Sequence, residues 1–186
     1  MPPTLPRGRP SSAAAILDTA RALLDEGRTV SLDSVAQASG LSKPGLMYHF
    51  PTKSALMDAL VDHVVDSQER ELSSFLAVPL DQATARQRLG AYVRWALLSR
   101  HCRSDLVMLS DPKLGDRMLA RWTERFDQWV QVPADASPDE QARLHAARLL
   151  ADGAWLADSS NTFPLSSDER PQVLSVALDL LGEESR

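Results

Sequence analysis

The sequence predicts an all-α protein in which three short N-terminal helices lead through a long fourth helix into a larger helical domain. Apolar residues recur along most of the chain with the spacing of one face of an α-helix. Alternating or β-branched runs bounded by turns, which would indicate strands, are almost absent. Glycine, proline and small polar residues separate the apolar segments, as expected where helices begin and end.

The composition indicates a folded protein of a reducing compartment. Of the 186 residues, 44% are hydrophobic and 24% are charged, which suffices for a core and argues against a disordered chain. The single cysteine, Cys102, excludes an internal disulfide. No apolar run reaches the roughly 18 residues of a membrane span, and the N-terminal apolar stretch is too short for a signal peptide. We therefore expect a soluble, cytoplasmic protein that does not enter a membrane.

The first two predicted helices are marked by local signals. The first begins at Ser11 or Ser12, either of which can cap it, and ends at Gly27. One face of this helix carries Ile16, Ala20, Leu23 and Leu24. A second, shorter helix spans 31–39 and begins with Ser31 as its cap.

The next segment completes a helix-turn-helix. Gly40 stands where a turn requires a positive φ, and a third helix spans 43–49. Ser42 can cap this helix, and Pro44 is tolerated because first-turn N–H groups have no helical partner. A fourth helix follows the cap Thr52 and runs to about residue 75, with Leu56, Leu60, Val64 and Val65 on one stripe.

The remaining chain predicts a second, wholly helical domain. The segment 77–84 is the expected junction, and further helices are expected near 83–100, 103–110, 113–131, 138–160 and 168–182. We therefore divide the chain into a flexible basic arm at 1–10, a helix-turn-helix domain at 11–54 and a helical domain at 55–186.

The residues around the third helix are suited to contact with DNA. A recognition helix enters the major groove with its N-terminal end toward the bases, and that end carries Ser42, Lys43, Pro44 and Gly45. Lys43 can reach a phosphate or a guanine edge, and Gly45 permits close approach. Tyr48, His49 and Lys53 can donate to flanking phosphates. The alternative is an ordinary polar surface helix. Met47 and Phe50 are expected in the core.

The charge distribution agrees weakly with a nucleic-acid partner at one end of the chain. The net charge is −5, which argues against a wholly basic binder. Residues 1–54, however, contain six basic and four acidic side chains, whereas residues 55–186 contain 14 basic and 21 acidic ones. This asymmetry is expected if only the N-terminal part meets phosphate.

The stretch "AAAILDTARALLDEGRTVSLDSVAQASGLSKPGLMYHFPTKSAL", which begins at residue 13, resembles the DNA-binding domain of the TetR family of transcriptional repressors. The resemblance implies a homodimer whose C-terminal domain binds an inducer. It also assigns Lys43, Pro44 and Gly45 to base-facing positions, and Tyr48, His49 and Lys53 to phosphate contacts. Many members carry the tyrosine one position earlier, where this chain has Met47. The stretch "LLADGAWLADSSNTFPLSSDER" resembles the last two helices of one C-terminal subtype.

The N-terminal "PRGRP" has two interpretations. It resembles a minor-groove-binding AT-hook, in which Arg7 and Arg9 would lie in a groove of enhanced negative potential. The alternative is a solubilising tail that contacts nothing.

The C-terminal domain contains a set of residues that could line a ligand pocket. These residues are Tyr92, Trp95, Cys102, Met108, Met118, Trp122, Phe126, Asp152 and Trp155, with His101 and Asp158 as further polar candidates. Ligand sites are mostly apolar with a few placed polar groups, so this set is suited to a partly apolar small-molecule inducer. The alternative is simple core packing. For Asp152, the alternative is a helical ion pair with Arg148.

The last two predicted helices are suited to dimerisation. The helix at 138–160 is apolar nearly all round from Ala146 to Ala157, and Ala142, Ala146, Gly153 and Ala157 lie on one side where another helix could approach. The resemblance to the TetR family implies that this helix and the helix at 168–182 form a four-helix interface with a second copy.

These observations predict a homodimeric regulator that binds double-stranded operator DNA. Such a protein would be a repressor released from a palindromic operator by a small-molecule inducer. One alternative is a helical sensor or carrier whose helix-turn-helix docks protein. Another is an enzyme, but no paired carboxylates or catalytic triad support it, and neither a cofactor nor a metal site is indicated.

Overall fold

The computed structural model describes residues 13–110 and 115–182, and these ranges contain helices and no strand. The predicted all-α class is confirmed. The α-helices are α1 (Ala13–Asp25), α2 (Leu32–Ala38), α3 (Lys43–His49), α4 (Lys53–Ser73), α5 (Ala85–Leu98), α6 (Arg103–Ser110), α7 (Gly115–Val130), α8 (Pro138–Ser160) and α9 (Arg170–Leu181). A short 3-10 helix, η1 (Leu80–Gln82), lies in the segment expected to join the two domains.

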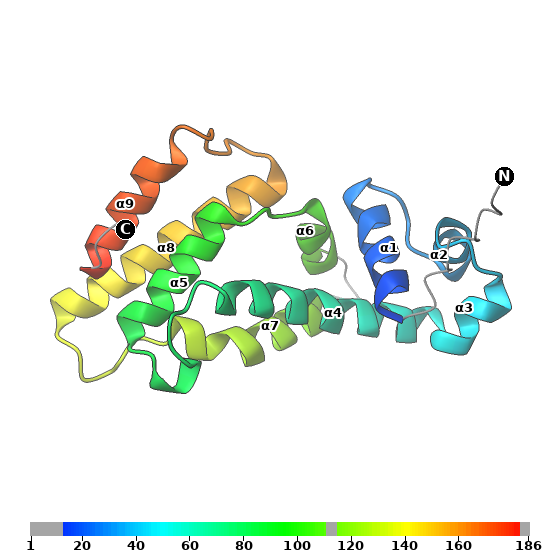
Figure 1. Ribbon diagram of the computed structural model, residues 1–186, viewed down its shortest axis with the longest axis horizontal. Helices are drawn as coiled ribbons and strands as arrows, with labels where there is room; N and C mark the ends of the chain where they lie inside the picture. The colour runs from blue at the N-terminus through cyan, green and yellow to red at the C-terminus, as the bar shows by residue number, and fades with distance from the viewer. Residues whose placement is uncertain (1–12, 111–114, 183–186) are drawn as a thin grey trace, which may run out of the picture.

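The first three helices form a small unit at one end of the molecule, which we call the headpiece (residues 13–50) (Figure 1). The apolar face predicted for α1 is buried, and Val35 of α2 and Leu46 of α3 are fully enclosed as well. Phe50, directly after α3, is also buried. Short helices of seven residues are marginal in isolation, so this shared core is what holds α2 and α3 in place.

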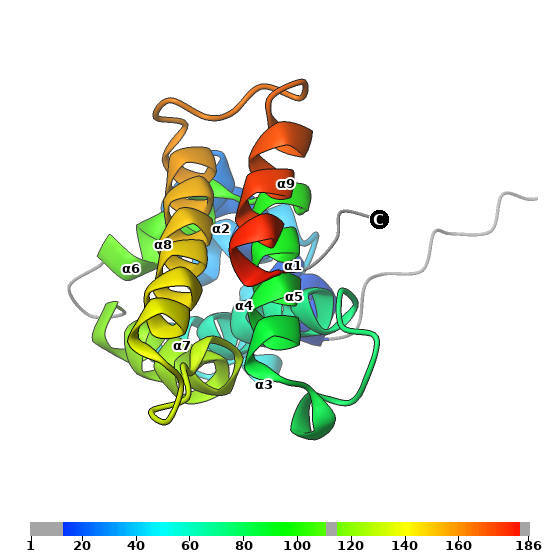
Figure 2. The same ribbon diagram turned by 90° about the vertical axis from the view of Figure 1, so that its left-hand side faces the viewer.

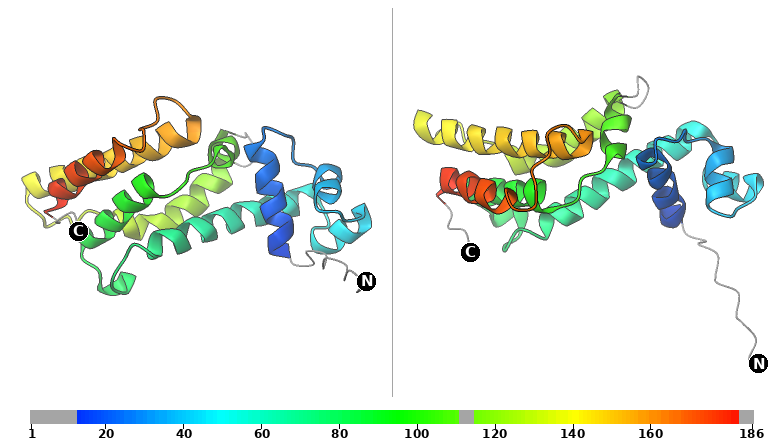
Figure 3. Two further views of the ribbon diagram at one scale, coloured as in Figure 1. Left: turned by 45° about the horizontal axis from the view of Figure 1, so that its top comes forward. Right: turned by 90° about the horizontal axis from the view of Figure 1, so that it is seen from above.

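Helix α4 connects the headpiece to the rest of the molecule, as the views from above and from the tilted side show (Figure 3). The stripe predicted for it, from Leu56 to Val65, is buried. Its outer surface is joined to α7 by ion pairs at four-residue spacing: Arg117 with Asp58, Arg121 with Asp62, and Arg125 with Asp66. Such exposed pairs add little stability, and they follow the line along which the two helices lie side by side.

Helices α5 to α9 form the larger unit, which we call the body (residues 85–182). Helix α5 is its central element, because α7, α8 and α9 all pack against it. Thr84 begins α5 with a capping box, in which Thr84 and Gln87 satisfy each other's backbone N–H groups. Helices α8 and α9 lie side by side across α5 (Figure 2).

The last helix begins later than residue 168. The Glu169 carboxylate accepts hydrogen bonds from the backbone N–H and the hydroxyl of Ser166, at 2.8 and 2.7 Å. These bonds stabilise a turn before the helix, and they lower the pKa of Glu169. Pro171 then occupies the first turn of α9, where it costs no helical hydrogen bond.

A buried polar cluster joins the headpiece to the body. The Asp105 side chain of α6 is fully enclosed; it accepts from Arg21 of α1 at 3.3 Å and from Gln68 of α4 at 2.9 Å. The backbone N–H of Ser104 donates to Asp25 of α1 at 2.7 Å. Burial raises the pKa of Asp105 to about 6, although the Arg21 guanidinium opposes the shift. Three helices therefore meet at one carboxyl group.

Candidate nucleic-acid interface and effector region

The turn between α2 and α3 has the geometry that the sequence predicts. Ser31 begins α2 with a capping box in which Ser34 is the partner. Gly40 has a φ of +67°, a conformation that side chains rarely adopt. The Ser42 hydroxyl then caps α3 by accepting from the N–H of Gly45 at 3.2 Å. Each cap satisfies a backbone donor that the helix itself leaves unpaired.

Gly45 has a local role in addition to the close approach that the sequence suggests. A methyl group at this position would lie 3.2 Å from the Ser42 hydroxyl oxygen, which is tighter than an ordinary contact. The missing side chain therefore leaves room for the cap as well as for a partner molecule.

The N-terminal end of α3 is presented to solvent. Ser42, Lys43 and Pro44 are exposed, and Gly45 is half-buried. The Lys43 ammonium lies 3.1 Å from the carboxylate of Asp33 on α2, and both side chains are more than half exposed. An exposed pair of this kind is worth little, so Lys43 can exchange it for a phosphate or a base.

The three residues assigned to phosphate contacts lie near one another in sequence and at the surface. Tyr48 is 86% exposed, and its ring forms a T-shaped contact with that of His49, with centroids 5.4 Å apart. Lys53 is exposed in the first turn of α4, where Thr52 caps the helix by accepting from Ala55 at 3.0 Å. A capped helix N-terminus with an adjacent lysine favours an anion.

The two residues expected in the core of this region, Met47 and Phe50, differ in burial. The prediction that Met47 lies in the core is wrong, because 41% of it is exposed. Helix α3 is only seven residues long and buries Leu46 on its inner side, so the next residue points away. Phe50 is buried as predicted. Arg7 and Arg9 of the basic arm, like the predicted caps Ser11 and Ser12, lie outside the described residues.

The body gathers part of the predicted ligand set into one aromatic cluster, made of Trp95, Trp122, Phe126 and Trp155. Trp122 stacks on Phe126 with centroids 4.0 Å apart and planes 9° apart. Trp95 lies 5.9 Å from Trp122 and 6.0 Å from Phe126, and Trp122 lies 5.9 Å from Trp155. Trp95 and Phe126 are buried, whereas the other two are partly exposed. The indole N–H groups of Trp95 and Trp155 have no hydrogen-bond partner.

Polar groups lie at the edge of this cluster. The Tyr92 hydroxyl donates to Asp152 at 2.9 Å, and Asp152 also pairs with Arg148 at 2.9 Å. Burial, reinforced by the Asp152 charge, raises the pKa of Tyr92, which therefore stays protonated. His101 meets the Trp95 ring at 4.8 Å, and burial lowers the pKa of His101. The helical pair proposed as the alternative for Asp152 is therefore present together with a tertiary contact.

Other members of the set have different surroundings. Met108 and Met118 are fully buried. Burial raises the pKa of Cys102, and the Asp25 charge adds to this effect, so the thiol is not activated as a nucleophile. Asp158 forms an ion pair with Arg170 at 2.7 Å, and this pair borders a shallow hollow of about 330 Å³.

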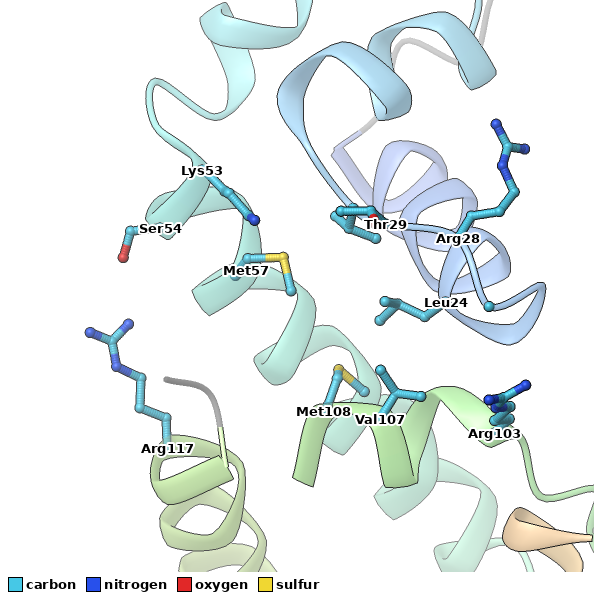
Figure 4. A pocket seen from close by; sticks show the side chains of 12 residues that line it. Leu24, Arg28, Thr29, Lys53, Ser54, Met57, Arg103, Val107, Met108 and Arg117 are labelled. Atoms are coloured by element: carbon cyan, nitrogen blue, oxygen red, sulfur yellow. The ribbon is translucent and has the colours of Figure 1, made fainter. Parts of the chain in front are cut away.

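A second, larger cavity is not predicted by the sequence. It has a volume of about 880 Å³ and lies between the headpiece and the body (Figure 4). Its lining residues are Leu24, Gly27, Arg28, Thr29, Val30, Lys53, Ser54, Met57, Arg103, Val107, Met108 and Arg117. Of the predicted ligand set only Met108 is among them. The lining comes from four helices and a loop, and no spacing along the chain links these segments.

Two other kinds of site are not found in the described ranges. No group of three or more His, Cys, Asp or Glu side chains there could hold a metal ion. No helix described in the structure is long and apolar enough to cross a membrane.

The fold and the exposed recognition helix define a helix-turn-helix DNA-binding protein with a separate helical effector domain. Residues 16–60 match the model for bacterial regulatory proteins of the tetR family, and residues 86–181 match that for the tetracyclin repressor-like C-terminal domain. The chain therefore belongs to the TetR family of DNA-binding transcriptional regulators. The family assignment agrees with the expectation that the protein is not an enzyme.

A relative agrees with this assignment, and two solved structures share the fold. The HTH-type transcriptional regulator EthR of Mycobacterium tuberculosis is 26% identical over 185 residues, which cover 91% of this chain and 86% of the relative. A TetR-family transcriptional regulator from Rhodococcus sp. superposes with a TM-score of 0.67 at 16% identity, covering 91% of this chain and 97% of that one. AmtR of Mycobacterium smegmatis has a TM-score of 0.54 at 20% identity, covering 98% and 92%. The two structures show the shared fold.

Proposed function

We propose that the protein is a homodimeric repressor that binds a palindromic operator and is released from it by a small-molecule inducer. Two copies of α3 would enter successive major grooves about 34–36 Å apart. The observation that carries the proposal is the exposed N-terminal end of α3, where Ser42, Lys43 and Gly45 stand at the surface on a capped and anchored helix. Acting on DNA, the protein would work inside the cell.

Within this interface, side chains would have two kinds of role. Lys43 and the open backbone at Gly45 would face the base edges. Tyr48, His49 and Lys53 would hold the phosphates on either side and fix the register of the helix. Lys43, Tyr48 and Lys53 are exposed and His49 is half-buried, which supports this division because the side chains can reach a partner without rearrangement of the headpiece core.

The dimer would form through the outer faces of α8 and α9. One side of α8 leaves small and apolar residues exposed, and α9 adds Val176; the α8 residues are Ala142, Ala146, Leu149, Gly153 and Leu156. Their spacing of three and four places them on one helical face, opposite the face that α8 packs into the body. Such an exposed apolar stripe on a soluble helix indicates a partner surface.

A Leu156→Glu variant tests this surface. A buried carboxylate pair related by the dimer axis would repel and lose solvation, so we expect monomers at concentrations at which the natural protein is dimeric. Sedimentation velocity would measure the change, and Leu119→Glu, at a comparably exposed leucine on α7, is the matched control. A Leu156→Glu protein that remains dimeric would exclude this face.

The inducer would act on the body through the aromatic cluster. Stacked and edge-on rings provide a surface for an apolar or aromatic compound, and the unpartnered indole N–H groups can donate to it. Tyr92 and Asp152 would supply the polar contacts. The dimer would have two conformations, which differ in the spacing of the recognition helices. An inducer can release the operator only if its affinity differs between these two conformations.

Selection of bound duplexes from a random DNA pool, followed by the salt dependence of the best duplex, tests the function. We expect a palindromic sequence whose affinity falls steeply with salt, because phosphate contacts release counterions. Binding to a protein target that is insensitive to salt, without enrichment of any duplex, would instead support a sensor whose helix-turn-helix docks protein.

A further inference from the structure

The cavity between the headpiece and the body has the dimensions of a small-molecule site. Its volume of about 880 Å³ falls within the range of about 300–1,000 Å³ that is usual for ligand pockets. It is separate from the aromatic cluster, because none of the rings of that cluster is in its lining.

The lining combines an apolar surface with positive charge. Leu24, Met57, Val107 and Met108 come from α1, α4 and α6, and their side chains gather around the middle of the cavity (Figure 4). Four basic residues surround them: Arg28, Lys53, Arg103 and Arg117. The lining residues include no Asp or Glu. A hollow lined by charge of one sign concentrates ions of the opposite sign.

Two of these four basic side chains form ion pairs with carboxylates, and two do not. Arg28 pairs with Glu26 at 3.2 Å, and Arg117 pairs with Asp58. Lys53 and Arg103 have no carboxylate partner within the described residues. Figure 4 shows the Lys53 ammonium directed toward the interior of the cavity, above Met57. The charge available to a ligand is therefore that of Lys53 and Arg103.

From these observations we propose that the cavity binds an amphipathic anion, an apolar molecule that carries one carboxylate or phosphate head. The apolar part would pack on Met57 and Val107, and the head would be held by Lys53 or Arg103. Apolar burial would supply most of the affinity, and the charged head would supply the selectivity.

Binding at this position would affect the DNA-binding surface directly. The cavity wall includes Thr29 and Val30, which lead into the helix-turn-helix, and it includes Lys53, which is proposed to hold a phosphate. An anion bound to Lys53 would compete with DNA for the same charge. This consequence, unlike the binding itself, depends on the proposed DNA-binding function.

Calorimetric titration of the full chain tests the site with probes that share one tail. Decanoate and decyl phosphate, each below its micelle concentration, should bind saturably, whereas decanol and decyltrimethylammonium should bind at least tenfold more weakly. A marked preference between the two anions would identify the head group. Equal binding of decanol and decanoate, or no saturable binding of either anion, would overturn the proposal.

Variants locate the site. Arg103→Gln and Lys53→Gln should each weaken decanoate binding about five- to tenfold, because each removes one charged contact. Arg143→Gln removes another exposed arginine, on α8 and outside the cavity, and should leave the affinity unchanged. Val107→Phe, which fills the apolar surface, should abolish binding while thermal unfolding confirms that the protein is folded. A loss of binding in Trp122→Ala but not in Arg103→Gln would assign the ligand to the aromatic cluster instead.

A final titration distinguishes ligand binding in the cavity from its proposed effect on DNA binding. Decanoate should weaken binding of the selected operator duplex by the natural protein and have a smaller effect on Arg103→Gln. If decanoate binds in the cavity but the operator affinity is unchanged, the site is supported and its coupling to DNA is wrong.

Discussion

The recognition end of the headpiece and the aromatic cluster of the body are built in opposite ways. At the recognition end, Lys43 and Tyr48 are exposed, and hydrogen bonds between residues three positions apart hold the helices. In the cluster, Trp95 and Phe126 are enclosed, and their contacts join different helices. A surface of the first kind can change its partner without changing the fold. A cluster of the second kind cannot change without affecting stability.

The strongest test of this comparison is Trp95→Ala. Trp95 is fully buried and contacts three rings from two other segments, so its truncation should lower the free energy of unfolding by about 3–5 kcal/mol. Urea unfolding followed by circular dichroism measures the loss. At a temperature where the variant is folded, its operator affinity should stay close to that of the natural protein. A variant that keeps its stability but binds DNA poorly would show that Trp95 serves DNA binding and not the stability of the body.

The stability contributed by the buried polar cluster that joins the headpiece to the body should depend on pH. Because the pKa of Asp105 is raised to about 6 in the folded protein, the native state binds more protons than the unfolded state between about pH 4 and 6. The contribution of Asp105 to stability is therefore fully present below pH 4 and is lost as pH rises through 6. The loss amounts to roughly 3 kcal/mol for a shift of about two pKa units.

The comparison with Asp105→Asn isolates this effect, because the other titrating groups are common to both proteins. The difference between their free energies of unfolding should change by roughly 3 kcal/mol from pH 4 to pH 7. The natural protein should become less stable relative to the variant as pH rises. Arg21, Asp25 and Gln68 face this carboxyl group from α1 and α4 and remain in the variant. Parallel stability curves would show that Asp105 keeps an ordinary pKa.

The difference between the two regions also explains how far the sequence could predict each. The headpiece follows from local signals: the caps Ser31 and Ser42, the positive φ of Gly40 and the tolerated Pro44 each act within four residues. The bounds of α3 and α8, each of which begins after a serine cap, coincide with the predicted ranges for the same reason. Met47 was misassigned because the burial of one residue in a short helix depends on neighbours distant in the chain.

The aromatic cluster of the body and the cavity depend on contacts between helices that are distant in the chain. The spacing of residues along the sequence does not predict such contacts. The i, i+4 spacing predicts that Trp122 and Phe126 share a face, and they do stack. It cannot indicate that Trp95 and Trp155 join them, because that depends on how α5 and α8 cross α7. In the same way, Lys53 and Arg103 are 50 positions apart, and only the packing of α1 against both α4 and α6 places them around one hollow.

The smallest expected effect lies at the recognition end, and it is the most specific. Lys43→Ala should weaken operator binding by about 1–2 kcal/mol and leave the unfolding midpoint unchanged, because the lysine is exposed and its pair with Asp33 is weak. Asp33→Asn is the complementary change: it removes a carboxylate that competes with DNA for Lys43, and should strengthen binding slightly. If Lys43→Ala reduces the salt dependence by about one counterion for all duplexes, the lysine contacts a phosphate; if it relaxes preference at one base pair, it contacts a base. Unchanged affinity at matched salt would remove Lys43 from the interface and leave Tyr48, His49 and Lys53 to account for DNA binding.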